Sequence, residues 1–352
     1  PLGLFDPESM AGVLEDEYGI PRRRLPGYMS PWALKRLDEF GGDISKFSVV
    51  RLMPSEQRRC LVAKTEPGDE NNQDISSLVG RVDIRKLEHF SQDDADAYSY
   101  TGGLNRTTQG LLEFVEMFKA PLKMLHPLLT ATQDGTYVGT ENVGAMPYQG
   151  IIVAHSNESE WESFKANRNN EAFLDRICVV KVPYCLRVTE ERMIYDKLVT
   201  NSELGAAPCA PDTLDMMARF SVLTRLKEHE NSNLYSKMRV YDGESLKDTD
   251  PNAKTVQEYR DAAGVTEGME GVSTRFAYNI LSETFNFDTD EVAADPVHQM
   301  YVLEKAIQRE QLPEETERRY LEFVKEDLAT RYAVFIGNEI RKAYLESYHS
   351  YG

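Results

Sequence analysis

The chain has 352 residues and a formal net charge of −18, with 58 acidic side chains against 40 basic ones. Hydrophobic residues make up 41% and charged residues 28%, which is globular composition and excludes wholesale disorder. The acidic balance argues against nucleic acid or an anionic membrane as the main partner, because both would repel this surface.

The four cysteines lack CxxC spacing, and no apolar run is long enough to span a membrane. We therefore expect reduced thiols, a cytoplasmic protein and no bound structural metal. The chain begins at Pro1 without an initiator methionine, and we expect it to be a piece of a longer protein.

The N-terminal residues combine helical and strand patterns. Apolar side chains recur with helical spacing over 31–40 and stop at Gly41 and Gly42, which predicts a helix. The β-rich alternation over 47–52 predicts a strand, and the polar segment 66–77 predicts a surface loop.

The middle of the chain has the pattern of an α/β core. Short apolar runs at 111–116, 151–154 and 177–182 predict strands, and apolar spacing over 124–129 predicts a helix. Near-continuous apolar strands separated by helices are typical of a parallel sheet covered on both faces. The fold class that we predict for this part is α/β.

After Pro183 the strand signals disappear. The patterns over 188–199, 213–230 and from Ala293 onward predict helices. The last of them carries an apolar stripe whose members recur every four residues, Tyr332, Ile336, Ile340, Tyr344 and Tyr348. We expect a further domain or a partner to cover this stripe.

Two carboxylates close the predicted strand at 111–116. Ligands of an open parallel sheet bind at the C-terminal strand edge, so Glu113 and Glu116 are placed to hold Mg²⁺ or to orient a water. The residues leave open the alternative that both carboxylates only solvate the strand end.

Asn157 follows the predicted strand 151–154, where its amide could reach a phosphate or a nucleophilic water. An asparagine that caps the next helix is the alternative. His155 lacks a second ligand at metal-binding spacing, so we expect it to bond locally.

Two arginines have places that suit phosphate recognition, because a guanidinium presents a planar fork of donors. Arg176 precedes the predicted strand 177–182, and Arg275 lies in the first turn of a helix that Ser273 would cap. The alternatives are a surface pair of Asp175 with Arg176 and an ordinary solvated Arg275.

Several common motifs are absent from the sequence. It holds no Gly-Lys dipeptide and therefore no glycine-rich phosphate-binding loop of the usual type. It also lacks the zinc-protease, serine-hydrolase and eukaryotic-kinase motifs. The residues alone leave the chemistry undetermined.

The order of these features resembles the second half of an AAA+ ATPase. Several literal stretches of the sequence resemble the PrkA-type serine protein kinase family. The resemblance covers essentially the whole chain, and the stretches that carry it are 66–77, 113–121, 154–161, 181–191, 235–244, 273–277 and 343–348.

The resemblance implies roles for four residues. Glu116 falls at the Walker B glutamate, which would polarise the attacking water or hydroxyl, and Asn157 at the sensor-1 position near the γ-phosphate. Arg176 resembles the arginine finger offered to a neighbouring subunit of a homo-oligomer. Arg275 resembles the sensor-2 arginine, which couples the lid to the nucleotide.

One position departs from the family pattern. Val115 stands where the Mg²⁺-linked aspartate is usual, and Glu113 is then the candidate substitute for cofactor binding.

The resemblance also implies a domain layout. A partial AAA+ core with a parallel sheet is expected over 1–187, an all-helical lid over 188–285, and a helical extension over 286–352 toward a C-terminal domain beyond Gly352. The phosphate-binding loop is expected upstream, so we expect this chain alone to bind ATP weakly or not at all.

The implied function is that of the ATPase and lid region of a serine protein kinase. The intact protein would bind ATP with Mg²⁺ and phosphorylate Ser or Thr of protein substrates. Two alternatives stay open, an AAA+ remodelling or protease-associated module without kinase activity and a nucleotide-free interaction scaffold.

Overall fold

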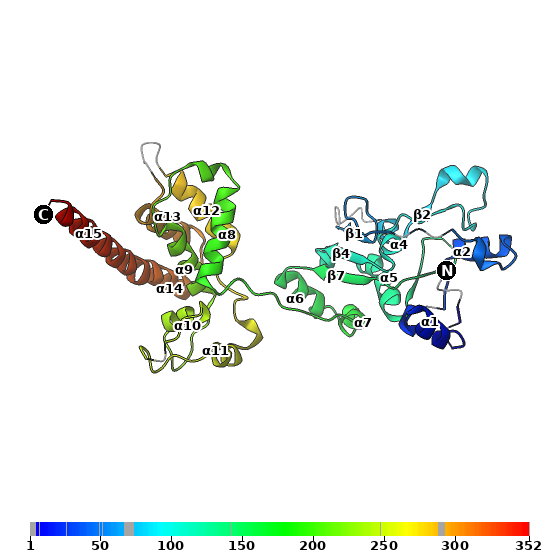
Figure 1. Ribbon diagram of the computed structural model, residues 1–352, viewed down its shortest axis with the longest axis horizontal. Helices are drawn as coiled ribbons and strands as arrows, with labels where there is room; N and C mark the ends of the chain where they lie inside the picture. Colours follow the sequence, from blue (N-terminus) through cyan, green and yellow to red (C-terminus); the bar gives the residue numbers. More distant parts are fainter. Residues whose placement is uncertain are drawn as a thin grey trace. The chain divides into compact units, whose positions relative to one another are not determined.

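The structure is a computed structural model that describes residues 5–6, 8–25, 27–48, 50, 52–66, 74–141, 143–246, 248–287 and 293–351 (Figure 1). The chain divides into two compact units, Pro1–Val179 and Val180–Gly352. The predicted boundaries after residues 187 and 285 stay predictions.

The first unit mixes short strands with helices. Its strands are β1 Val62–Thr65, β2 Arg81–Val82, β3 Tyr98–Ser99, β4 Leu111–Val115, β5 Thr136–Val138, β6 Ala145–Pro147 and β7 Ile151–His155. Its α-helices are α1 Ala11–Tyr18, α2 Pro31–Glu39, α3 Ser76–Val79, α4 Gly103–Thr107, α5 Leu122–Gln133, α6 Glu158–Ala166 and α7 Glu171–Leu174.

A parallel three-stranded sheet in the order β1-β4-β7 forms the centre of this unit. The predicted strands at 111–116 and 151–154 are confirmed as β4 and β7, and the helix over 124–129 is part of α5. Leu112 pairs with Ala63 on one side and Ile152 on the other, so β4 is the middle strand. The α/β prediction is therefore confirmed.

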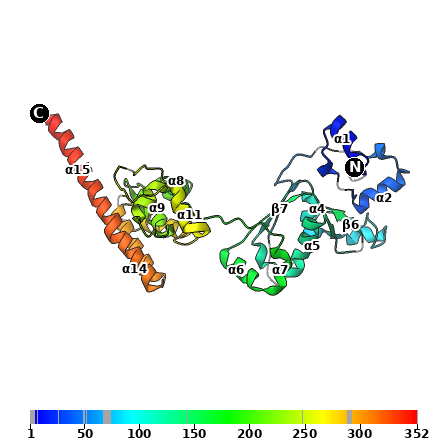
Figure 2. The same cartoon turned by 90° about the horizontal axis from the view of Figure 1, so that it is seen from below.

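Helices cover one face of this sheet, where the prediction had both faces covered. Leu112 and Phe114 are fully buried in a core to which α4 and α5 also contribute. Both views show these two helices next to the strands (Figures 1 and 2). On the opposite face Leu111, Ile151 and Val153 are exposed. Alternate side chains of a strand point to opposite faces, so this face stays open to solvent.

Two predicted strands are wrong. Residues 177–182 have no strand structure, and Val180 and Val182 are exposed to 75% and 80%. The described residues among 47–52 form no strand either. A β-rich composition makes a strand only where a neighbouring strand accepts its hydrogen bonds, and none of the described residues does so here.

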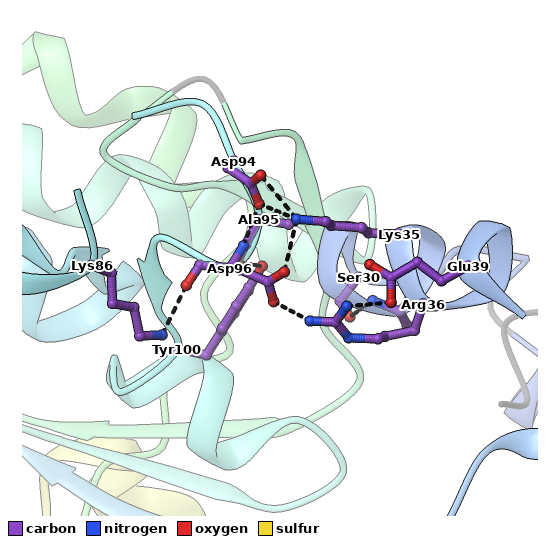
Figure 3. Close-up of polar contacts among 10 residues, drawn as sticks. Ser30, Lys35, Arg36, Glu39, Lys86, Asp94, Ala95, Asp96 and Tyr100 are labelled. Carbon is purple, nitrogen blue, oxygen red and sulfur yellow. Dashed lines mark hydrogen bonds and ion pairs between the residues drawn. The ribbon is translucent and has the colours of Figure 1, made fainter. Parts of the chain in front are cut away.

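The predicted helix over 31–40 is confirmed as α2, which begins after the N-cap Ser30 and buries no residue of its own. Ion pairs hold it to the loop before β3 (Figure 3). Lys35 Nζ lies 2.6 Å from Asp94 Oδ1 and 2.8 Å from Asp96 Oδ2, and Arg36 also pairs with Asp96. The attachment of α2 is therefore mainly electrostatic.

The second unit is helical in its described part, apart from isolated bridges. Its helices are α8 Val188–Thr200, α9 Thr213–Arg225, α10 Leu234–Tyr241, α11 Val256–Ala263, α12 Thr274–Phe285, α13 Pro296–Arg309, α14 Glu314–Glu322, a π-helix at Phe323–Leu328 and α15 Ala329–Tyr351. The predicted helices over 188–199 and from 293 onward are confirmed, and that over 213–230 ends earlier, at Arg225.

A buried ion pair stands in the core of the second unit. Arg225 Nη2 lies 2.7 Å from Glu191 Oε1, and both side chains are 0% exposed. Arg225 also donates to the carbonyl oxygens of Val272 and Cys185. The guanidinium therefore ties the chain just before α8 to the helical core.

The apolar stripe of α15 is exposed over most of its described length. Tyr332 packs against the core, whereas Ile340 and Tyr344 are 64% and 69% exposed. Both views show α15 extending beyond the other helices of its unit (Figures 1 and 2). Among the described helices none is both long and apolar enough to cross a membrane.

Candidate functional site at the sheet edge

Glu116 directly follows the middle strand β4 and has an uncommon backbone conformation. Its φ of 47° lies in the left-handed region, which non-glycine residues adopt rarely and often at functional sites. The short 3₁₀ helix Met117–Lys119 follows at once, and Lys119 N–H donates to the Glu116 carbonyl. This tight turn brings Lys119 back over Glu116.

Asn157 lies at the same edge of the sheet. Val115 of β4 pairs in parallel register with His155 of β7, so the two strands end side by side. Asn157 is the N-cap of α6 but makes no side-chain capping bond, and its Nδ2 donates to Glu160 Oε1 at 3.3 Å. The capping alternative holds for its position and not for its side chain.

A polar cluster joins the two strand ends, and we call it the edge cluster: Glu116, Lys119, Ser156, Asn157 and Glu160. Lys119 Nζ lies 2.8 Å from Glu116 Oε2 and 3.4 Å from Glu160 Oε1. Ser156 Oγ donates to Glu160 Oε2 at 2.8 Å. One ammonium therefore bridges the carboxylate after β4 and the carboxylate of α6.

The cluster shifts the pKa of two of its members. Burial alone would raise the pKa of Glu160, but the Ser156 hydrogen bond and the Lys119 charge together bring it below its usual value. The hydrogen bond to Glu116 raises the pKa of Lys119. Both groups are therefore charged at neutral pH, and the bridge is an ion pair.

Glu113 makes a separate contact. Its Oε1 lies 3.4 Å from Nε2 of His155, which is a contact between the adjacent strands β4 and β7. No group of three His, Cys, Asp or Glu side chains in the described ranges is arranged to hold a metal ion. The oxygen donors of the edge cluster are of the kind that Mg²⁺ takes together with substrate phosphates, so their chemistry fits that ion.

Arg176 lies outside the edge cluster. Its Nε donates to Gln133 Oε1 at 2.8 Å and its Nη1 donates to the Ala172 carbonyl. The side chain is exposed and forms no ion pair with the described residues, so its charge is uncompensated. The predicted pair with Asp175 is not what holds it.

Arg275 belongs to the second unit, in the first turn of α12. The Ser273 hydroxyl accepts the Phe276 N–H, so the predicted cap is present. Arg275 itself is exposed. Its role beside a nucleotide stays a prediction.

The sequence analysis missed Lys119 and Glu160 as members of the site. Glu160 stands three residues after Asn157, the spacing at which a helix-start carboxylate turns back to the cap. Lys119 stands three residues after Glu116. These spacings were the signal that could have pointed to both residues. The direction of the Lys119 side chain, however, depends on the left-handed turn at Glu116.

Comparison with family models places the chain. Residues 1–233 match the model described as the PrkA AAA domain, and residues 235–352 match the PrkA serine protein kinase C-terminal domain. The class is therefore the AAA-type module that the sequence resemblance implied. More particularly, the chain belongs to the PrkA family.

The second match corrects one expectation. The C-terminal domain had been expected beyond Gly352, whereas its model matches within this chain from residue 235 onward.

Curated relatives agree with this membership. The chain is 67% identical over 352 residues to serine/threonine kinase YeaG of Escherichia coli K12, covering 100% of this chain and 55% of that protein. It is 36% identical over 357 residues to the ATP-dependent protease PrkA of Bacillus subtilis, covering 99% of this chain and 54% of that protein. The chain thus spans about half the length of these relatives.

Likeness to solved structures is low. The crystal structure of NtrX from Brucella abortus in complex with ADP matches with a TM-score of 0.32 and 12% identity, covering 76% of this chain and 59% of that chain. The fold assignment accordingly comes from the chain's own parallel sheet and from the family match.

Proposed function

We propose that this chain is the ATPase and lid region of a serine protein kinase. In the intact protein, the γ-phosphate of ATP would pass to a Ser or Thr hydroxyl of a protein substrate. The observation that carries the proposal is the convergence of Glu116 and Asn157 at the ends of adjacent parallel strands. This is the edge at which open α/β sheets bind their ligands.

Glu116 has the chemistry for activating the attacking hydroxyl. Its carboxylate is partly exposed at 40%, so it can accept a proton or a hydrogen bond from an incoming group. Asn157 commits one amide N–H to Glu160, and its second N–H and its oxygen can orient a phosphate or nucleophile. Lys119 supplies a positive charge beside them.

ATP and Mg²⁺ are the cofactors that we propose. Mg²⁺, when bound, would neutralise charge on the transferred phosphoryl group. Glu116 and Glu160 are the carboxylates that could face it, and Glu113 is the further candidate next to Val115. The sequence has no Gly-Lys dipeptide, so we propose that other residues of the intact protein make most of the contacts to the phosphates.

Arg176 supports a homo-oligomer in this proposal. An exposed guanidinium without an ion pair among the described residues is available to a neighbouring subunit. There it would stabilise charge on the transferring phosphate. The cytoplasm is the location that we propose, where unpaired thiols such as Cys178 stay reduced.

A second candidate is an ATP-driven remodelling or protease-associated module. The Bacillus subtilis relative is named an ATP-dependent protease, which favours this candidate. It predicts that substrate proteins stimulate release of free phosphate without formation of a phosphoprotein.

Labelled nucleotide separates these candidates. The intact protein is incubated with γ-labelled ATP, Mg²⁺ and a protein extract, and free phosphate and phosphoprotein are both counted. Label in Ser or Thr supports the kinase. Free phosphate alone supports the remodeller, and neither product supports the nucleotide-free scaffold.

Nucleotide binding by this chain is a second test. A fluorescent ATP analogue with Mg²⁺ is titrated into the chain and into an Arg275→Ala variant. We expect no binding below millimolar nucleotide, because the loop that cradles phosphates is absent from the sequence. Micromolar binding that the variant loses would contradict this expectation and would show that Arg275 contributes to nucleotide binding.

A further inference from the structure

A cavity of about 630 Å³ opens beside the edge cluster, within the first unit. Two cluster members, Lys119 and Glu160, are among the residues that line it. Its volume falls in the range of pockets that bind small ligands or peptide segments, roughly 300–1,000 Å³. The cavity therefore borders the proposed site of phosphate transfer through these two residues.

Aromatic side chains give this cavity an apolar wall. Phe118 and Phe164 both line it and their ring centroids lie 4.3 Å apart, and Leu122 and Pro121 continue the apolar surface. Trp161 packs behind them, with its ring 5.2 Å from Phe118. Such a wall favours an apolar side chain of the bound molecule.

Polar groups line the remaining side. Ser159, Ser163 and Asn167 come from α6 and the turn that follows it. The Ser159 hydroxyl and the Asn167 side-chain N–H make no hydrogen bond with the described residues, and the Asn167 oxygen accepts only a local N–H. Hydroxyl and amide groups both donate and accept, which suits a peptide main chain.

Charge points to the sign of the ligand. Among the residues that line the cavity, Lys119 and Glu160 form an ion pair and offset each other, while the whole chain has a net charge of −18. Because of this net charge, a basic segment would be attracted to the surface of the chain and an acidic one repelled.

We propose that this cavity binds the substrate segment of the phosphorylated protein. The segment carries a Ser or Thr that reaches Glu116, an apolar side chain on the Phe118–Phe164 wall, and flanking Lys or Arg. This inference rests on the proposed kinase function, and it adds the place and sequence preference of the substrate.

The test uses two synthetic peptides that share a central Ser followed by Leu, one flanked by Lys and the other by Glu. Phosphate transfer to each is measured with the intact protein, its Ser163→Trp variant and its Ala166→Trp variant. Ser163 lines the cavity, whereas Ala166 is an exposed residue of the same helix that does not. The second variant therefore controls for an added indole on α6.

We expect Ser163→Trp to raise KM for the Lys-flanked peptide about tenfold or more with kcat little changed, because it removes binding and leaves the chemistry intact. Ala166→Trp should leave KM unchanged. For each of the three proteins, the Glu-flanked peptide should be a poorer substrate than the Lys-flanked peptide. An unchanged KM in Ser163→Trp would overturn the inference and leave the kinase function standing. If Ser163→Trp fails to fold, Ser159→Arg provides the same test by repelling the Lys-flanked peptide.

A binding measurement keeps the two proposals apart. Trp161 is one of two tryptophans, so a Trp32→Phe chain reports on this cavity through Trp161 fluorescence alone. A fluorescence change with the Lys-flanked peptide, lost in Ser163→Trp, supports the peptide site even if no phosphate is transferred, and that combination refutes the kinase. No change with either peptide would overturn the peptide site.

Discussion

Lys119 Nζ lies 2.8 Å from Glu116 Oε2 and 3.4 Å from Glu160 Oε1, and so connects the end of the middle strand to α6. The left-handed turn at Glu116 makes this possible, since it returns the chain toward its own carboxylate. Lys119 is therefore a positioning residue for Glu116, and it also lines the proposed substrate cavity.

Replacing Lys119 should change the pKa of Glu160. In Lys119→Met, the pKa of Glu160 should rise, because burial favours the neutral acid and the ammonium that opposed it is gone. Carboxyl NMR titration of the wild-type chain and the variant measures this shift. A Lys165→Met variant is the control, because Lys165 pairs with Glu162 instead. An unshifted Glu160 in Lys119→Met would contradict the bridge.

The attachment of α2 should depend on pH. The hydrogen bonds from Lys35 hold the pKa values of Asp94 and Asp96 below their usual range. Groups with a lowered folded-state pKa stabilise the docked form above their unfolded pKa, about 3.9, and lose that contribution as the pH falls through the lowered value.

Hydrogen exchange of the α2 amides measures this dependence. Protection should persist at neutral pH and fall below about pH 4. Lys35→Met should lower protection at neutral pH, because it removes the ammonium that Asp94 and Asp96 share in Figure 3 and leaves only the pair of Arg36 with Asp96. Equal protection in both chains at neutral pH would contradict electrostatic docking.

The buried pair in the second unit should dominate its stability. Arg225→Met leaves the fully buried Glu191 carboxylate without its counter-charge, so we expect a loss of about 3–5 kcal/mol in the free energy of unfolding. Urea unfolding followed by circular dichroism measures it. Arg309→Met removes an exposed pair with Glu283 and should cost less than about 1 kcal/mol. Similar losses in both variants would contradict this difference.

The exposed stripe of α15 predicts an association surface. Ile340 lies at its middle and is 64% exposed, so Ile340→Asp should not unfold the second unit. If a partner or a further copy covers the stripe, the substitution should lower the oligomeric mass of the intact protein in light scattering. An unchanged mass, with wild-type stability, would count against an interface there.

The core strands were predictable from sequence because β4, the middle strand, is a short apolar run that buries Leu112 and Phe114. The same reasoning failed for residues 177–182, which have the composition of a core strand but pair with no strand among the described residues. Composition reports what a segment can do, whereas pairing depends on strands distant in the chain. The open face of the sheet could not be predicted for the same reason, because the covering of a face also depends on segments distant in the chain.

The site was predictable in part for a related reason. Parallel strands bring their C-terminal ends together, so the proximity of Glu116 and Asn157 follows from the topology alone. The Lys119 bridge does not, because it depends on a single backbone conformation at Glu116. The roles of Arg176 and Arg275 concern a neighbouring subunit and a nucleotide, and they stay predictions.

The role of Glu116 is the central claim, and one measurement tests it most directly. Single-turnover transfer of phosphate from Mg-ATP to protein is compared between the intact protein, Glu116→Gln and Glu162→Gln, the last being an exposed glutamate of α6 paired with Lys165. We predict that Glu116→Gln lowers the rate by about 10²–10⁴-fold, as loss of a positioned base does, while Glu162→Gln stays near wild type. Equal rates in the two variants would contradict the assignment of Glu116.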